Sequence, residues 1–191
     1  MGKKIALLSI YVITLFASVI TSAQSNPVVV METNKGSIKI EVWEDKAPIS
    51  AANFLRYVDE SYYDGLIFHR VIPGFMAQGG GFSEDMVQKS TFESIKNEAS
   101  AALPNKRGTL AMARTNVVDS ATSQFFINLV DNDFLNHTDN TPRGYGYAVF
   151  AEVIGGMEIV DSMATVETTN KRGHQNVPVE PIVMTRVTRQ K

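Results

Sequence analysis

The segment from Phe68 to Phe82 limits what the chain can fold into more than any other stretch, and it reads FHRVIPGFMAQGGGF. Pro73-Gly74 in its middle favours a tight turn, because proline fixes φ and glycine accepts a left-handed conformation. The three glycines at 79–81 allow close approach of another part of the chain, or positive φ. The segment therefore predicts a strand over Leu66–Ile72, then a turn, then backbone that permits unusually close packing.

The first 23 residues differ from the rest of the chain. Lys3 and Lys4 precede the apolar run Ile5–Ile20, and the small residues Thr21-Ser22-Ala23 follow it. This is the pattern of a secretory signal peptide cleaved after Ala23, and a run of 16 residues is short for a bilayer span. An uncleaved N-terminal anchor is the alternative. We expect export across the inner membrane to a bacterial periplasm, or to the outside of a cell that lacks one, with no stable membrane association after cleavage.

Residues 24–191 are long enough for one domain with a full core. They carry 16 basic and 20 acidic residues, so their net charge is −4. That balance argues against a nucleic-acid surface, which would be basic. There is no cysteine, so acylation as a lipoprotein is excluded. We take a monomer as the expected state.

Apolar periodicity outlines the secondary structure. Strand patterns of period two contrast with helical spacing of three and four. The expected strands are Val28–Glu32, Ser37–Trp43, Leu66–Ile72 and Pro181–Val187. One helix is expected to begin at Pro48, and a second is expected to span Met157–Ala164. Many strands with two widely separated helices favour a β-barrel or sandwich capped by helices, and periodicity does not choose between them.

The side chains of the 68–82 segment suit one kind of chemistry. Arg70 and Gln78 stand among large apolar residues, without an acid, a cysteine or a hydroxyl nucleophile. Rotation of an X-Pro peptide bond crosses a barrier of about 18–20 kcal/mol and breaks no bond. In the twisted state the prolyl nitrogen is pyramidal and has a lone pair, to which a guanidinium can donate. Gln78 can both donate and accept, so it can hold the arginine and a substrate carbonyl together.

Three further stretches complete a family resemblance. They are Leu110–Arg114, Ser120–Ile127, and Asp133–His137 leading to Gly146–Phe150. Together with the 68–82 segment and Lys46-Ala47-Pro48, in this order and spacing, they resemble the cyclophilin family of peptidyl-prolyl cis-trans isomerases from about Val28 to Val187. The resemblance implies a mainly β fold, an eight-stranded antiparallel closed β-barrel capped by two α-helices. It also implies an active groove on the outer face of the barrel.

The resemblance assigns site residues position by position. Arg70 matches the catalytic arginine and Gln78 the glutamine that orients it. The remaining substrate-binding positions are the proline pocket of Phe75, Met76, Phe126 and Leu135, the groove positions Ala113, Arg114 and Gln124, and the rim positions Phe134 and Tyr147. Arg114 falls where the family binds the residue before proline through backbone groups, so its side chain is expected to matter less.

Three positions depart from the best-known eukaryotic pattern. Phe134 replaces a tryptophan, Tyr147 a histidine and Gly81 an aspartate, and all three are similar to the bacterial secreted branch of the family. Without the indole N–H we expect only weak cyclosporin binding. The expected partners are proline-containing polypeptides, namely exported proteins whose folding the protein would assist. No cofactor and no nucleic acid are expected to bind.

Two functions other than catalysis are also compatible with the sequence. A proline-peptide-binding chaperone module with incidental turnover could use the same groove, and an inert scaffold could keep only the barrel. No metal is expected, because His137 and His174 lack partners at ligand spacing. His69 is expected to be buried and hydrogen-bonded. Trp43, the single tryptophan, is expected to lie away from the groove.

Overall fold

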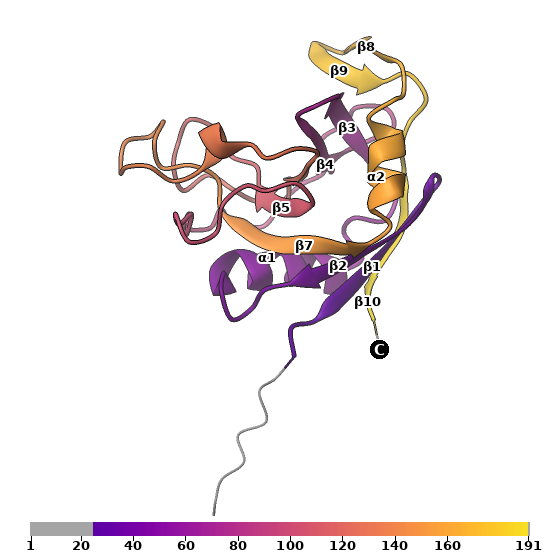
Figure 1. Cartoon of the computed structure of the whole chain (residues 1–191). Helices are drawn as coiled ribbons and strands as arrows, with labels where there is room; N and C mark the ends of the chain where they lie inside the picture. Colours follow the sequence, from indigo (N-terminus) through magenta and orange to yellow (C-terminus); the bar gives the residue numbers. More distant parts are fainter. Residues whose placement is uncertain (1–24, 191) are drawn as a thin grey trace, which may run out of the picture.

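The structure is a computed structural model that describes residues 25–190 (Figure 1). The predicted signal peptide, residues 1–23, lies outside the described residues, so its cleavage stays a prediction. In the part of the chain that the structure describes, no helix is long and apolar enough to cross a membrane.

The first two strands confirm the period-two reading. β1 (Val28–Thr33) pairs antiparallel with β2 (Gly36–Val42) across a short turn. Ile38, Ile40 and Val42 are fully buried, while the residues between them reach solvent. Alternate residues of a strand point to opposite faces, so β2 buries one apolar row against the core.

Eight strands form one antiparallel sheet in the order β10-β1-β2-β7-β5-β6-β4-β3. The remaining strands are β3 (Leu66–Ile72), β4 (Met76–Ser83), β5 (Thr109–Met112), β6 (Phe125–Asn128), β7 (Val149–Gly155) and β10 (Met184–Arg189). The two ends meet at an isolated bridge between Ile67 and Val183, and Phe68 N donates to Ile182 O at 2.9 Å. The sheet is therefore a nearly closed barrel, which confirms the predicted fold and excludes the sandwich.

Two α-helices accompany the barrel, as predicted. α1 (Pro48–Asp59) begins with proline in its first turn, where the missing N–H costs nothing. It buries Phe54, whose ring packs at 5.2–5.5 Å against the rings of Tyr63, Phe125 and Phe150. α2 (Met157–Met163) is one residue shorter than expected.

A small second sheet was not expected from the sequence. β8 (Thr168–Lys171) and β9 (His174–Pro178) form a hairpin beyond α2. Figure 1 shows this hairpin projecting from the barrel near β3. It brings Gly173, His174 and Gln175 beside a cavity that Arg70 and Gln78 also line.

Candidate active site

The β3–β4 hairpin places Arg70 and Gln78 side by side. Gly74 takes φ +68° in the turn, which favours glycine, and Phe75 N donates to Ile72 O at 3.1 Å. The register then pairs Arg70 with Gln78. Arg70 Nη1 donates to Gln78 Oε1 at 3.5 Å. Among residues 25–190 no carboxylate forms a salt bridge with Arg70, so its charge is available to a ligand.

Gln124 extends this pair into a row of three polar side chains. Gln78 Nε2 donates to Gln124 Oε1 at 3.0 Å, and Gln124 O accepts a hydrogen bond from Ala113 N at 2.9 Å. Gly81 lies against Gln124, because a Cβ at position 81 would lie 2.7 Å from the Gln124 side chain. The close approach predicted for the glycine run is therefore realised at this position.

A small cavity of about 140 Å³ lies beside Arg70 and Gln78; we call it the proline cavity. Nine of the eleven predicted site residues line it: Arg70, Phe75, Met76, Gln78, Ala113, Arg114, Phe126, Leu135 and Tyr147. Met76, Phe126 and Leu135 are buried. The rings of Phe126 and Tyr147 meet edge-to-face at 5.6 Å. The arrangement offers an apolar hole with a cation and an amide at its rim.

The other two predicted residues lie next to the proline cavity. Gln124 lines the groove beyond Gln78. Phe134, on the short 3₁₀ helix η1 (Asp133–Leu135), is 73% exposed and its ring lies 5.5 Å from that of Phe75. An exposed ring at this rim can contact a ligand that overhangs the cavity.

The Arg114 side chain is more engaged than the sequence led us to expect. Its Nε donates to Gly146 O at 2.9 Å and its Nη2 to Pro142 O at 2.8 Å. Its guanidinium also stacks over the Tyr147 ring, 4.9 Å from the ring centroid. The side chain thus fastens the loop before Tyr147 to the end of β5.

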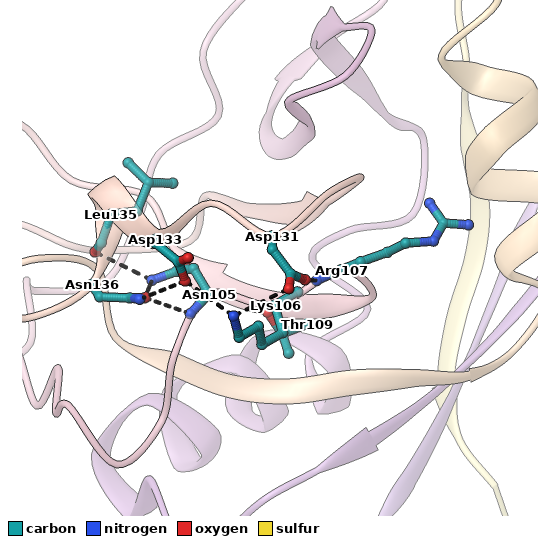
Figure 2. A network of polar contacts seen from close by, with 8 residues as sticks. All are labelled: Asn105, Lys106, Arg107, Thr109, Asp131, Asp133, Leu135 and Asn136. Atoms are coloured by element: carbon teal, nitrogen blue, oxygen red, sulfur yellow. Dashed lines mark hydrogen bonds and ion pairs between the residues drawn. The ribbon is translucent and has the colours of Figure 1, made fainter.

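Three buried asparagines hold the walls of the proline cavity, a role that sequence reasoning missed. Asn105 Nδ2 donates to Leu135 O at 3.2 Å and to Tyr147 O at 3.5 Å, and Figure 2 shows the Leu135 contact. Asn105 Oδ1 accepts from Asn128 at 3.3 Å, and Asn132 Nδ2 donates to Phe75 O at 3.0 Å. Because buried amides must be hydrogen-bonded, this network fixes three wall residues through their backbone carbonyls.

Charged residues flank this network at the surface. Lys106 Nζ lies 3.1 Å from both the Asp131 and the Asp133 carboxylates, and Arg107 N donates to Asp131 at 2.9 Å (Figure 2). These pairs are half-exposed, so each contributes little to stability. They nevertheless tie the segment before β5 to the loop that carries Phe134 and Leu135.

His69 is buried, as predicted, but the expectation that it is hydrogen-bonded is wrong for one nitrogen. Among the described residues, its Nδ1 has no hydrogen-bond partner. The ring packs against Phe82 at 4.7 Å, and Phe82 packs against His174 at 4.9 Å. Burial, together with electrostatic interactions with His174 and Arg70, lowers the pKa of His69 to about 4. The imidazole is therefore neutral at pH 7.

The position expected for Trp43 is also wrong. Its side chain is buried in the same apolar cluster as Met76, Phe126 and Leu135, three residues that line the proline cavity. The residue follows β2 and donates from its backbone N to Phe150 O at 2.8 Å. Strand periodicity places Trp43 on a strand but does not indicate which part of the core its ring reaches.

Comparison with known proteins agrees with this geometry. Residues 28–189 match the family of cyclophilin type peptidyl-prolyl cis-trans isomerases. A peptidyl-prolyl cis-trans isomerase of Acinetobacter baylyi is 57% identical, over 84% of both chains. Peptidyl-prolyl cis-trans isomerase A of Dickeya dadantii is 50% identical over 96% of both chains. Isomerase B of Escherichia coli is 54% identical over 84% of this chain and 98% of its own.

The fold has solved counterparts as well. A cyclophilin type peptidyl-prolyl cis-trans isomerase of Cryptosporidium parvum, crystallised in the presence of the dipeptide Ala-Pro, superposes with a TM-score of 0.71. It is 25% identical, and the match covers 86% of this chain and 99% of that one. Fold, site and sequence agree, so the chain belongs to the cyclophilin family and is a peptidyl-prolyl cis-trans isomerase.

Proposed function

We propose that Arg70 carries the isomerase activity by donating to the prolyl nitrogen as its peptide bond twists. The nitrogen lone pair is exposed only when resonance is lost, so the guanidinium binds the twisted state better than either planar isomer. Four decades of acceleration need about 5.4 kcal/mol, at about 1.36 kcal/mol per decade. A preoriented cation beside an apolar cavity is a means of supplying it.

The other residues of the proline cavity bind the proline ring and orient the guanidinium of Arg70. The buried wall of Met76, Phe126 and Leu135 accepts the pyrrolidine ring and holds it. Gln78 accepts from Arg70 and keeps the guanidinium at the rim, and its position also suits a contact to a substrate carbonyl. The single observation that carries this proposal is the 3.5 Å contact between Arg70 and Gln78 at the mouth of a cavity of about 140 Å³.

A chaperone module that binds proline peptides with only incidental turnover would use the same groove. NMR exchange spectroscopy on a short Ala-Pro peptide separates the two, because it reports binding and cis-trans exchange together. We expect saturable acceleration of exchange by the purified protein. Binding without acceleration would favour the chaperone.

We further propose that the substrates are proline-containing segments of exported proteins. The match to the Dickeya isomerase covers 96% of this chain and therefore reaches into residues 1–23, because residues 24–191 alone are about 88% of it. Expression of the full chain in a bacterium, followed by fractionation and mass spectrometry, tests the export step. We expect a periplasmic, monomeric product beginning at Gln24, and a product that retains residues 1–23 would contradict cleavage.

A further inference from the structure

A second cavity adjoins the proline cavity and has a different chemical character. It measures about 420 Å³ and is lined by Arg114, Asn116, Phe134, Leu135, Pro142, Arg143 and Tyr147. Arg114, Leu135 and Tyr147 line both cavities. A peptide whose proline fills the proline cavity therefore lies within reach of this second one, which we call the arginine-lined cavity.

The lining carries two positive charges and no acid. Within residues 25–190 neither Arg114 nor Arg143 forms a salt bridge with a carboxylate. Arg114 donates to the carbonyl oxygens of Thr115, Pro142 and Gly146, and these contacts orient the guanidinium without neutralising it. An anion that enters the cavity thus meets uncompensated positive charge.

Asp139 is the one acidic residue of the loop 137–146 that carries Arg143, and it does not line the cavity. The Asp139 carboxylate accepts hydrogen bonds from the backbone N–H and the hydroxyl of Thr141, and these bonds lower its pKa. It therefore stays ionised, occupied by its own loop, and does not line the cavity.

The loop that carries Arg143 is held by its own backbone. Thr138 N donates to Gly144 O at 2.7 Å and Tyr145 N donates to Thr141 O at 2.8 Å. Arg114 joins the loop to the barrel through Pro142 O at 2.8 Å. These bonds fix the base of the Arg143 side chain, although the side chain itself is exposed.

We propose that the arginine-lined cavity is a substrate subsite for an acidic side chain next to the proline. The inference rests on the isomerase function proposed above and adds a sequence preference to it. The carboxylate of aspartate or glutamate would lie near Arg143 and Arg114, while Phe134 and Leu135 cover its methylene groups. Because the site is open to solvent, the preference is modest, as for exposed ion pairs.

The test compares kcat/KM for peptides that differ only beside the proline. Two series, with glutamate, glutamine or lysine either directly before or directly after the proline, are followed by NMR exchange without a coupled protease. In at least one series we expect glutamate to exceed glutamine by roughly two- to fivefold at low salt. Comparison of the two series shows on which side of the proline the acidic side chain of the peptide is recognised. The preference should shrink as salt is added, because exposed charges are screened.

Charge variants assign the preference to this cavity. Arg143→Gln should reduce the glutamate-to-glutamine ratio of kcat/KM. Arg143→Glu should reverse the charge preference, so that the lysine peptide becomes the better substrate. Arg186→Gln, at an exposed arginine of β10, should keep the wild-type ratio. Equal rates for the three peptides, or a ratio unchanged by Arg143→Glu, would overturn the subsite. If no peptide is accelerated at all, the isomerase proposal fails instead, and the same ratios read as affinities in NMR titrations still decide the subsite.

Discussion

Gln78 Oε1 lies 3.5 Å from Nη1 of Arg70, and the other end of the same amide donates to Gln124 Oε1 at 3.0 Å. One amide therefore determines how two neighbours are held. Its carbonyl must face the guanidinium, because only the oxygen can accept, and its NH₂ must then face Gln124. The row sets the direction of the cation at the rim of the proline cavity.

Gly81→Ala should disturb that row without touching the substrate. A Cβ at position 81 would lie 2.7 Å from the Gln124 side chain, so Gln124 must move and Gln78 loses its acceptor. We expect kcat/KM to fall roughly three- to tenfold, the scale of one lost hydrogen bond. Gly155→Ala is the matched control, since its Cβ would lie an ordinary 3.6 Å from Lys39. Equal activity of both variants would show that the Gln124 contact does not matter.

Asn105→Ala should weaken both the fold and substrate binding. The substitution removes the buried donor to Leu135 O, the partly buried donor to Tyr147 O and the buried acceptor of Asn128. We expect the free energy of unfolding to fall by about 1–3 kcal/mol and KM to rise more than kcat falls, because the cavity walls loosen. Asn170→Ala, on exposed β8, is the control. Urea unfolding and peptide kinetics give both readouts, and a destabilised variant with unchanged KM would assign Asn105 to stability alone.

Protonation of His69 should destabilise the protein in mild acid. Burial lowers its pKa to about 4, below the value of 6.5 for an unperturbed histidine, so the folded state favours the neutral ring. This contribution is fully present above about pH 6.5 and is lost as the pH falls towards 4, where the unfolded chain binds the proton more readily. The difference corresponds to about 3 kcal/mol.

Urea unfolding between pH 7.5 and 4 measures that loss. In His69→Gln the pH dependence over this window should be flatter than in the wild type. His137→Gln should keep the wild-type profile, because His137 is partly exposed and bonded to Tyr145 O. Parallel profiles for His69→Gln and the wild type would remove His69 as the cause.

Phe134→Trp should strengthen cyclosporin binding. Phe134 is 73% exposed at the rim, so the larger indole fits without disturbing the core and adds an N–H donor that phenylalanine lacks. We expect weak inhibition of the wild type and a Kd lowered roughly two- to tenfold in the variant. Ile154→Trp, at the exposed position of the otherwise buried or half-buried β7, controls for added apolar surface. Inhibition of the wild type at nanomolar concentrations would contradict the expectation.

Local pattern predicted much of this architecture. The alternation of Ile38, Ile40 and Val42 and the proline at the start of α1 are short-range signals, and both elements stand where they were expected. The β8–β9 hairpin was missed because β8, Thr168–Lys171, is polar and largely exposed and so has no apolar row to detect. Barrel closure was predicted from family resemblance, since the Ile67–Val183 bridge joins residues with no local relation.

The site residues that belong to a sequence motif could be predicted, and those outside the motifs could not. Arg70, Met76, Gln78 and Phe126 come together because β3, β4 and β6 are adjacent in the barrel, whereas the other five predicted residues of the cavity lie outside the strands. Asn105 has no comparable signal, as its partners Leu135 and Tyr147 lie 30 and 42 residues away. Trp43 was misplaced for a similar reason, because its packing depends on how the strands close.

The most direct test of the catalytic role of Arg70 measures kcat/KM for an Ala-Pro peptide in the wild type, Arg70→Ala and Arg70→Lys. We expect kcat/KM to fall by one to three decades in Arg70→Ala, or about 1.4–4 kcal/mol, with partial retention in Arg70→Lys. Circular dichroism and unfolding curves should match the wild type, since Arg70 lies at the cavity rim and not in the core. Unchanged turnover in a folded Arg70→Ala protein would contradict the proposed mechanism.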